Sequence, residues 1–149
     1  MIKDLYLNIG TVNTYYNFRS VNFNEVEVLN LVSAIYINDI PEQFSNLKKL
    51  IINKTPIKFL PKYLNELESL IISENDFIPE IPDNFVNMKE IRLFKANNIQ
   101  EIPETFTKLE KLIIKDSKYF NESMIEDLKK SFPYLKRIEI DKKFIWLNE

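Results

Sequence analysis

The sequence contains no cysteine and no histidine, and its single glycine is Gly10. It therefore has no thiol nucleophile, no disulfide, no zinc site of the usual kind and no histidine acid–base catalyst. One glycine also excludes the glycine-rich loops that hold phosphate groups. Acid pairs such as Glu122 and Glu126 remain, but nothing in the sequence places them in a cleft. We therefore predict a protein that is not an enzyme and that holds no cofactor and no metal.

Long apolar runs and an excess of one charge are also missing. No run approaches the ~20 residues of a membrane span, and the first residues, MIKDLYLNIG, lack the apolar region of a signal peptide. The 20 basic and 22 acidic residues are interspersed, with a net charge of −2 and no basic block typical of nucleic-acid binding. We expect no membrane partner and no nucleic-acid partner. The lack of cysteine fits a reducing compartment, so we expect a cytoplasmic protein, or one inside a host cell if it is exported without a cleaved signal.

What the chain does contain is an internal repeat. The phrase IPEQFSNLKKLII begins at Ile40 and returns as IPETFTKLEKLII at Ile102, with only polar letters changed. Related phrases begin at Leu60 and Ile81, so the period is about 20–21 residues. The repeats keep their apolar residues at fixed positions, while the polar residues between them change. This pattern indicates units that stack on one another around a shared core. With 149 residues, the chain is long enough for one domain, which we assign to residues 1–149.

Each unit contains one strand. In the unit LKKLIINKTPI, Leu50 and Ile52 alternate with Ile51, which is the period of two that a strand requires. We expect Leu47, Leu50, Ile52 and Ile57 to face the core. The prolines at 41, 61, 82 and 103 suit the connection on the outside of each unit and not a sheet interior.

The two ends of the chain repeat the pattern less well. We assign 1–25 to a degenerate N-terminal repeat or a hairpin cap around Gly10, 26–119 to the repeats, and 120–149 to a C-terminal repeat and cap. The inserted phrase NESMIEDLKKSF predicts a helix near 120–132, with Asn121 or Ser123 as its N-cap. Trp146 is expected to be buried over the last unit, and a contact of Trp146 in an edge-to-edge dimer is the alternative.

The repeated pattern L-x-x-L-x-L, an apolar residue, and then [IL]-P-x-x-[FL]-x-x-L resembles the leucine-rich repeat family over about 26–140. The short period is similar to the bacterial-type and Ras-suppressor-like classes. The resemblance implies an α/β fold: a curved horseshoe solenoid with one parallel sheet on its concave side and turns or 3₁₀ turns on its convex side. The family's asparagine after the strand occurs here only as Asn75. Ser or Thr partly replaces its hydrogen bonds and Ala does not, so we expect a weak polar ladder; the equivalent residues are Ala34, Thr55, Ala96 and Ser117.

The strand pattern also gives the residues that point away from the core. In the middle of the strands these are Asn30, Ile51, Ile71, Arg92, Ile113 and Glu139. The outward row before it is Val28, Lys49, Ser69, Glu90, Lys111 and Arg137. The outward row after it is Val32, Asn53, Ser73, Phe94, Lys115 and Asp141. Apolar side chains in these rows indicate either a partner-binding patch or merely the high β-propensity of isoleucine.

Leucine-rich repeat proteins that resemble this chain are generally non-catalytic modules for protein–protein interaction. We therefore expect a monomer that binds a protein partner, of unknown identity, through the concave sheet face. The predicted partner-binding residues are Val28, Lys49, Ile51, Ser69, Ile71, Ser73, Glu90, Arg92, Phe94, Lys111 and Ile113. The alternative function is that of a structural or assembly protein that forms homo-oligomers through its sheet edges or its C-terminal cap.

Overall fold

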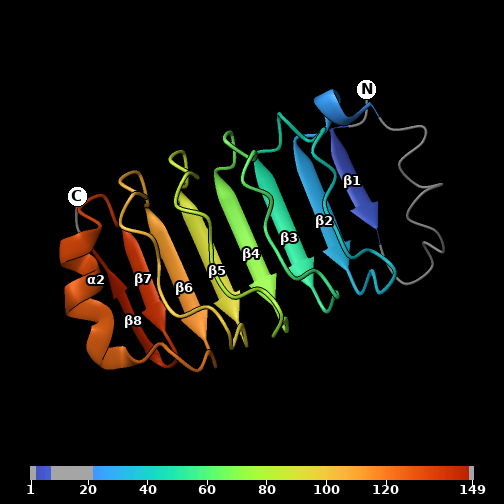
Figure 1. The fold of residues 1–149 in the computed structure, drawn as a ribbon. Helices are drawn as coiled ribbons and strands as arrows, with labels where there is room; N and C mark the ends of the chain where they lie inside the picture. Colours follow the sequence, from blue (N-terminus) through green and yellow to red (C-terminus); the bar gives the residue numbers. More distant parts are fainter. Residues whose placement is uncertain (1–2, 8–21, 148–149) are drawn as a thin grey trace.

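The computed structural model describes residues 3–7 and 22–147 of the chain, which form a solenoid of stacked coils (Figure 1). The strands are β1 (Asp4–Leu7), β2 (Val28–Val32), β3 (Lys49–Asn53), β4 (Ser69–Ser73), β5 (Glu90–Phe94), β6 (Lys111–Lys115), β7 (Arg137–Ile140) and β8 (Lys143–Trp146). The helices are the 3₁₀ turns η1 (Phe23–Glu25) and η2 (Glu122–Met124) and the short α-helix α2 (Ile125–Ser131). Gly10 lies outside the described residues, and so does the hairpin considered around it.

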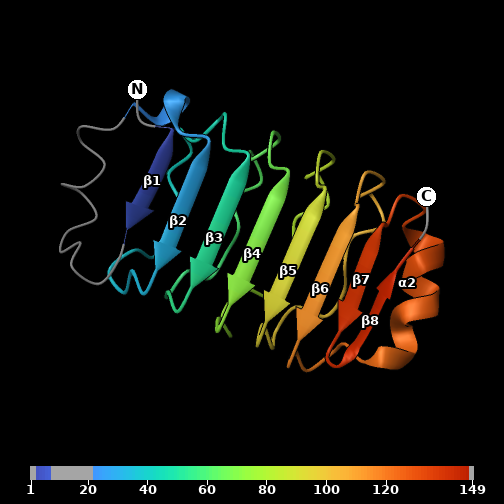
Figure 2. The same ribbon diagram turned by 180° about the vertical axis from the view of Figure 1, so that it is seen from behind.

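All eight strands form one sheet in the order of the sequence. Neighbouring strands from β1 to β7 are parallel, and each coil returns through turns on the other side of the molecule (Figures 1 and 2). The register keeps equivalent repeat positions side by side, as in the pairs Leu29–Leu50 and Leu50–Leu70. The prediction of a repeat solenoid is therefore confirmed, and the predicted parallel sheet is found from β1 to β7.

One continuous core lies behind the sheet. It runs from Val26 to Ile140, and the four side chains Leu47, Leu50, Ile52 and Ile57 are fully buried as expected. The third residue after each of the four repeat prolines adds a second buried row, which consists of Phe44, Leu64, Phe85 and Phe106. A single coil has no partner for this apolar surface, so burial between coils supplies the main stabilisation.

The backbone turns away from the sheet in the same way in each of five coils. The residue directly after each of the strands β2 to β6 has a φ of 48–51°, a left-handed value that is unfavourable for a residue other than glycine. In four of these coils its N–H donates to the carbonyl of the last strand residue of the next coil, for example from Lys54 to Ser73 over 3.1 Å, and the Asp116 N–H donates to the Asp141 side chain. These bonds between coils offset the strain; the five residues are Ser33, Lys54, Glu74, Lys95 and Asp116.

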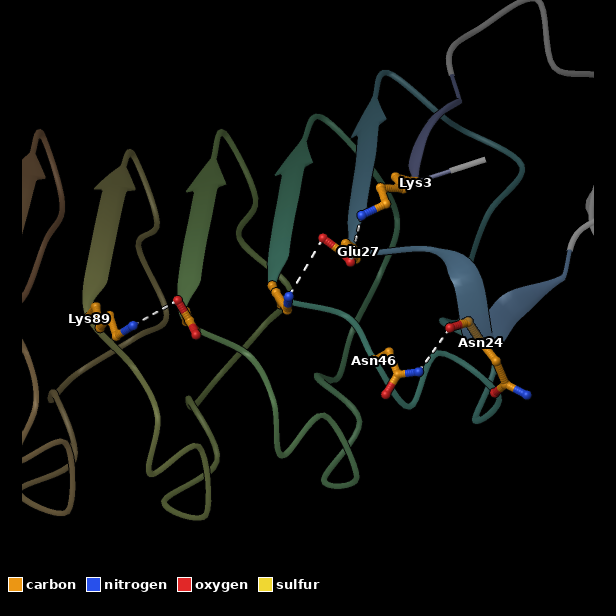
Figure 3. Close-up of polar contacts among 7 residues, drawn as sticks. Lys3, Asn24, Glu27, Asn46 and Lys89 are labelled. Carbon is orange, nitrogen blue, oxygen red and sulfur yellow. Dashed lines mark hydrogen bonds and ion pairs between the residues drawn. The ribbon is translucent and has the colours of Figure 1, made fainter. Parts of the chain in front are cut away.

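At the other end of the strands, where they begin, charges of alternating sign stand one residue before each of β1 to β7, and part of this series is drawn in Figure 3. Lys3 and Lys48 both pair with Glu27, over 3.3 and 3.6 Å, and Lys89 pairs with Glu68 over 3.0 Å. The backbone is tied at the same positions, since the N–H groups of Lys48 and Lys49 both donate to the Glu27 carbonyl. Exposed ion pairs of this kind contribute little to stability. We therefore infer that they help to set the register between neighbouring coils.

Asparagine side chains connect the coils in two different places. In the interior, Asn75 Nδ2 donates to the carbonyls of Thr55 and Ile57, and its Oδ1 accepts from the N–H groups of Phe77 and Ile78. Thr55 Oγ1 is buried without a hydrogen-bond partner among the described residues, so this threonine does not make the hydrogen bonds that Asn75 makes. The interior ladder is thus discontinuous.

Outside the core, other asparagines bond to the backbone of the preceding coil. Asn46 Nδ2 donates to the carbonyl of Asn24 over 2.8 Å (Figure 3), and Asn87 Nδ2 donates to that of Asn65 over 3.0 Å. Ser117 contributes at the interior position, because its Oγ accepts from the Ala96 N–H. Polar links between coils therefore exist, but mostly in the outer turns and not at the position that the resemblance indicated.

The C-terminal end differs from the prediction in one respect. The helix is present: η2 and α2 cover 122–131, and the Asn121 side chain accepts from the Ser123 N–H as an N-cap. Trp146, however, is 63% exposed, so the prediction that it is buried over the last coil is wrong. The chain turns back after β7 to form β8, which is antiparallel and places Trp146 opposite Arg137. The sheet is therefore not entirely parallel.

Candidate functional site: the open sheet face

One face of the sheet is not covered by any other part of the described chain. We call it the open sheet face and define it as the outward side chains of β2 to β7. Every second residue of these strands is buried and the residues between them are partly exposed, with Ile113 as the main departure. The pairing Asn30–Ile51–Ile71–Arg92–Ile113–Glu139 places the predicted middle row side by side across the sheet.

The first part of this face, from β2 to β4, is mostly uncharged. Val28, Ile51 and Ile71 are partly exposed there, and the remaining outward residues are polar amides and hydroxyls apart from Lys49 and Val32. Lys49 forms no ion pair within the described part of the chain. Phe94, at the end of β5, continues the apolar surface beside Ser73.

The second part, from β5 to β7, contains two charge clusters. In the first, the Glu90 carboxylate accepts hydrogen bonds from Ser69 Oγ over 3.0 Å and from Arg92 Nε over 2.8 Å, and it pairs with Lys111 Nζ over 2.9 Å. Burial raises the pKa of Glu90, but the hydrogen bonds from Lys111, Arg92 and Ser69 outweigh it and hold the pKa at about 2. Glu90 is therefore ionised at neutral pH and fixes both cations in place.

The second cluster is centred on Glu139. Lys115 Nζ lies 2.5 Å and an Arg137 guanidinium nitrogen 2.9 Å from this carboxylate, and their hydrogen bonds lower its pKa below the ordinary value. The Arg137 guanidinium also lies 5.0 Å from the ring centre of Phe144 and 5.3 Å from that of Trp146. Cations stack favourably on aromatic faces at such distances, so β8 holds Arg137 against the sheet.

The structure differs from the sequence expectation at Ile113. The alternation places it on the open sheet face, but it is only 5% exposed. It stands between Arg92 and Glu139 in its row and between Lys111 and Lys115 on its strand. All four of these residues belong to the two charge clusters, whose closed ion pairs cover it. Ile113 is therefore packed under the clusters and is not available as a contact residue in this arrangement.

Three exposed aromatic residues flank the open sheet face, and sequence reasoning had not assigned any of them to it. Tyr6, 64% exposed, pairs with Asn30 at one end, and Phe144 and Trp146 stand on β8 at the other end. Alignment of the repeats places Tyr6 in the middle row, so a signal for it existed. No glycine marks the turn between β7 and β8, so the pattern gave no signal for Phe144 or Trp146.

Other kinds of site have little support. Across residues 3–7 and 22–147, no group of three or more acidic side chains is arranged to hold a metal ion. No helix within these ranges is both long enough and apolar enough to cross a membrane. A comparison with protein-family models gave no match, and a comparison with curated protein sequences gave none either. The fold and the open face define a solenoid protein built of stacked, mostly parallel-strand coils.

Proposed function

We propose that this chain is a leucine-rich repeat protein and acts in the cytoplasm, or inside a host cell, as a non-catalytic module that binds another protein through the open sheet face. The family assignment is supported by the 20–21-residue repeat and by the stacked coils that it produces. In the terms of that family, the open sheet face is the concave face.

The observation that carries this proposal is the apolar surface of β2 to β5. The partly exposed apolar side chains on this face do not pack into the core, which is complete behind the sheet; they are Val28, Ile51, Ile71 and Phe94. Contiguous exposed apolar side chains on a soluble protein usually mark a contact surface. Anchors of this type, surrounded by polar side chains, are also the usual arrangement at protein interfaces.

The size of the face indicates how a partner engages it. Six strands at ~4.8 Å give a sheet roughly 30 Å wide, and a depth of ~15 Å offers only about half of the ~800 Å² per partner of a standard interface. We therefore expect the partner to contact a rim as well. Tyr6 on β1 and Trp146 on β8 are exposed aromatic residues that extend the contact surface beyond these six strands.

The experiment is affinity capture from a cell lysate with the wild-type protein and with the double variant Ile71→Asp, Phe94→Asp. Both side chains point away from the core, so the variant is expected to keep the circular dichroism of the wild type. Capture of the partner is expected to weaken by at least ~100-fold, which corresponds to about 2.7 kcal/mol.

A matched control carries the same kind of change on the turn side of the coils. Phe59 is 71% and Val86 49% exposed there, and the double variant Phe59→Asp, Val86→Asp is expected to capture the partner as the wild type does. If the open-face variant folds and still captures the same partner, while the control loses it, the open sheet face is not the binding surface.

A further inference from the structure

The charge of the open sheet face differs in sign from that of the whole protein. The outward side chains of β2 to β7 include five bases and two acids and so carry a net charge of +3, while the chain as a whole has −2. The remainder of the chain therefore has a net charge of −5. The bases are Lys49, Arg92, Lys111, Lys115 and Arg137, and the acids are Glu90 and Glu139.

The internal ion pairs do not cancel this positive charge. Each carboxylate is shared by two cations, so each of the two clusters keeps one positive charge. The carboxylates also lie deeper than the bases: the side chains of Glu90 and Glu139 are 20% and 14% exposed, against 28–39% for the four bases that pair with them. A molecule that approaches the face therefore meets cations first.

An apolar side chain separates the positive charges of the open sheet face. Lys49 stands on β3, and the other four bases stand on β5, β6 and β7. Strands two apart lie about 10 Å from each other, so Lys49 and Arg92 on β5 are separated by about that distance across the strands. Ile71 on β4 lies between these two strands, and Phe94 lies at the end of β5.

From this arrangement we infer that the partner segment that occupies the open sheet face is acidic and carries an apolar side chain between carboxylates that lie about 10 Å apart. This inference rests on the proposed function and specifies the chemistry of its partner. Complementary charge of this kind accelerates encounter and excludes basic partners.

A protein segment fits the face better than a nucleic acid does. A phosphate backbone presents a continuous line of negative charge and offers no apolar group to pack against the aliphatic side chain of Ile71 between the cations. The remaining −5 on the rest of the chain also repels a long polyanion that extends past the face. Single-stranded DNA is therefore a competing outcome of the test, and we do not propose it as a ligand.

The test is selection from a random peptide display library on the purified wild-type protein, followed by sequencing of the enriched peptides. The dependence of enrichment on the open sheet face is established with the double variant Ile71→Asp, Phe94→Asp. We expect peptides that depend on the face to contain Asp and Glu at least about twofold more often than the starting library. The charge reversal Lys111→Glu, Lys115→Glu is expected to abolish this excess. The matched reversal Lys58→Glu, Lys62→Glu, at two exposed lysines outside the strands, is expected to retain it.

The outcomes separate this inference from the proposed function. Face-dependent peptides without an acidic excess overturn the inference and leave the proposed function in place. If no enriched peptide depends on the face, both are overturned. Short single-stranded DNA that competes as well as the acidic peptides also overturns the inference, because the face is then a general polyanion site. If Lys111→Glu, Lys115→Glu fails to fold by circular dichroism, Lys111→Met, Lys115→Met removes the same charges, and an unchanged acidic excess in that variant contradicts the inference.

Discussion

Asn75 is the residue at which the structure makes its strongest prediction about stability. It is 1% exposed and makes four hydrogen bonds of 2.9–3.1 Å, two to carbonyls of the preceding coil and two from N–H groups of its own turn. Asn75→Ala removes all four and leaves backbone groups buried without partners. At roughly 1 kcal/mol per net bond, with an additional penalty for each unpaired group, we expect a loss of about 3–5 kcal/mol. A loss of this size is a large fraction of the stability of a typical domain, which is about 5–15 kcal/mol.

Thr55→Val is the matched comparison, because Thr55 occupies the equivalent position one coil earlier. Its side chain is 3% exposed, and its Oγ1 has no hydrogen-bond partner within the described residues. Valine has the same shape without the hydroxyl, so we expect no loss and a gain of up to about 1 kcal/mol. Urea unfolding followed by circular dichroism measures both variants. A loss below about 1 kcal/mol for Asn75→Ala, or equal losses for the two variants, refutes the reasoning.

Three further predictions concern the charge clusters, the C-terminal strand and the core. Because the pKa of Glu90 is lowered from 4.5 to about 2, its ion pairs stabilise the fold above pH 4.5, and this stabilisation is lost as the pH falls towards 2. We expect the loss in unfolding free energy to be about 1–2 kcal/mol after solvent screening, and a Glu90→Gln variant whose stability has the same pH dependence as the wild type contradicts this. Trp146→Ala is expected to cost less than about 1 kcal/mol in urea unfolding, since Trp146 is 63% exposed, and a loss of 3 kcal/mol or more indicates burial instead. Phe106→Ala, at a fully buried position, is expected to cost about 3–5 kcal/mol in the same assay, and a loss below about 1 kcal/mol is inconsistent with the stacked core.

Most of the fold follows from the repeat. Once the apolar letters are aligned, the alternation of Leu50, Ile51 and Ile52 sets which side chains enter the core, and a shift of one residue would reverse every strand. The observed pairing of Ile51 with Ile71 agrees with that alignment. The helix was also predictable, because the inserted phrase carries its own period and its own cap at Asn121.

The sequence was less informative wherever side chains from different coils interact. The hairpin of β7 and β8 turns through Asp141 and Lys142, with Asp141 at a φ of 51°, and no glycine or asparagine marks that turn. Ile113 carries the same pattern as Ile71, yet it is covered because charged residues from three strands close over it. Burial of this kind depends on ion pairs across the sheet, and the period of a single strand does not contain that information.

The central claim is that a partner protein occupies the open sheet face, and hydroxyl-radical footprinting of the captured complex tests it most directly. The measurement compares oxidation of Phe94, on the open sheet face, with oxidation of Phe59, which is 71% exposed outside the strands. The account predicts that binding lowers the oxidation of Phe94 and leaves that of Phe59 unchanged. Protection of Phe59 with no change at Phe94 would contradict it.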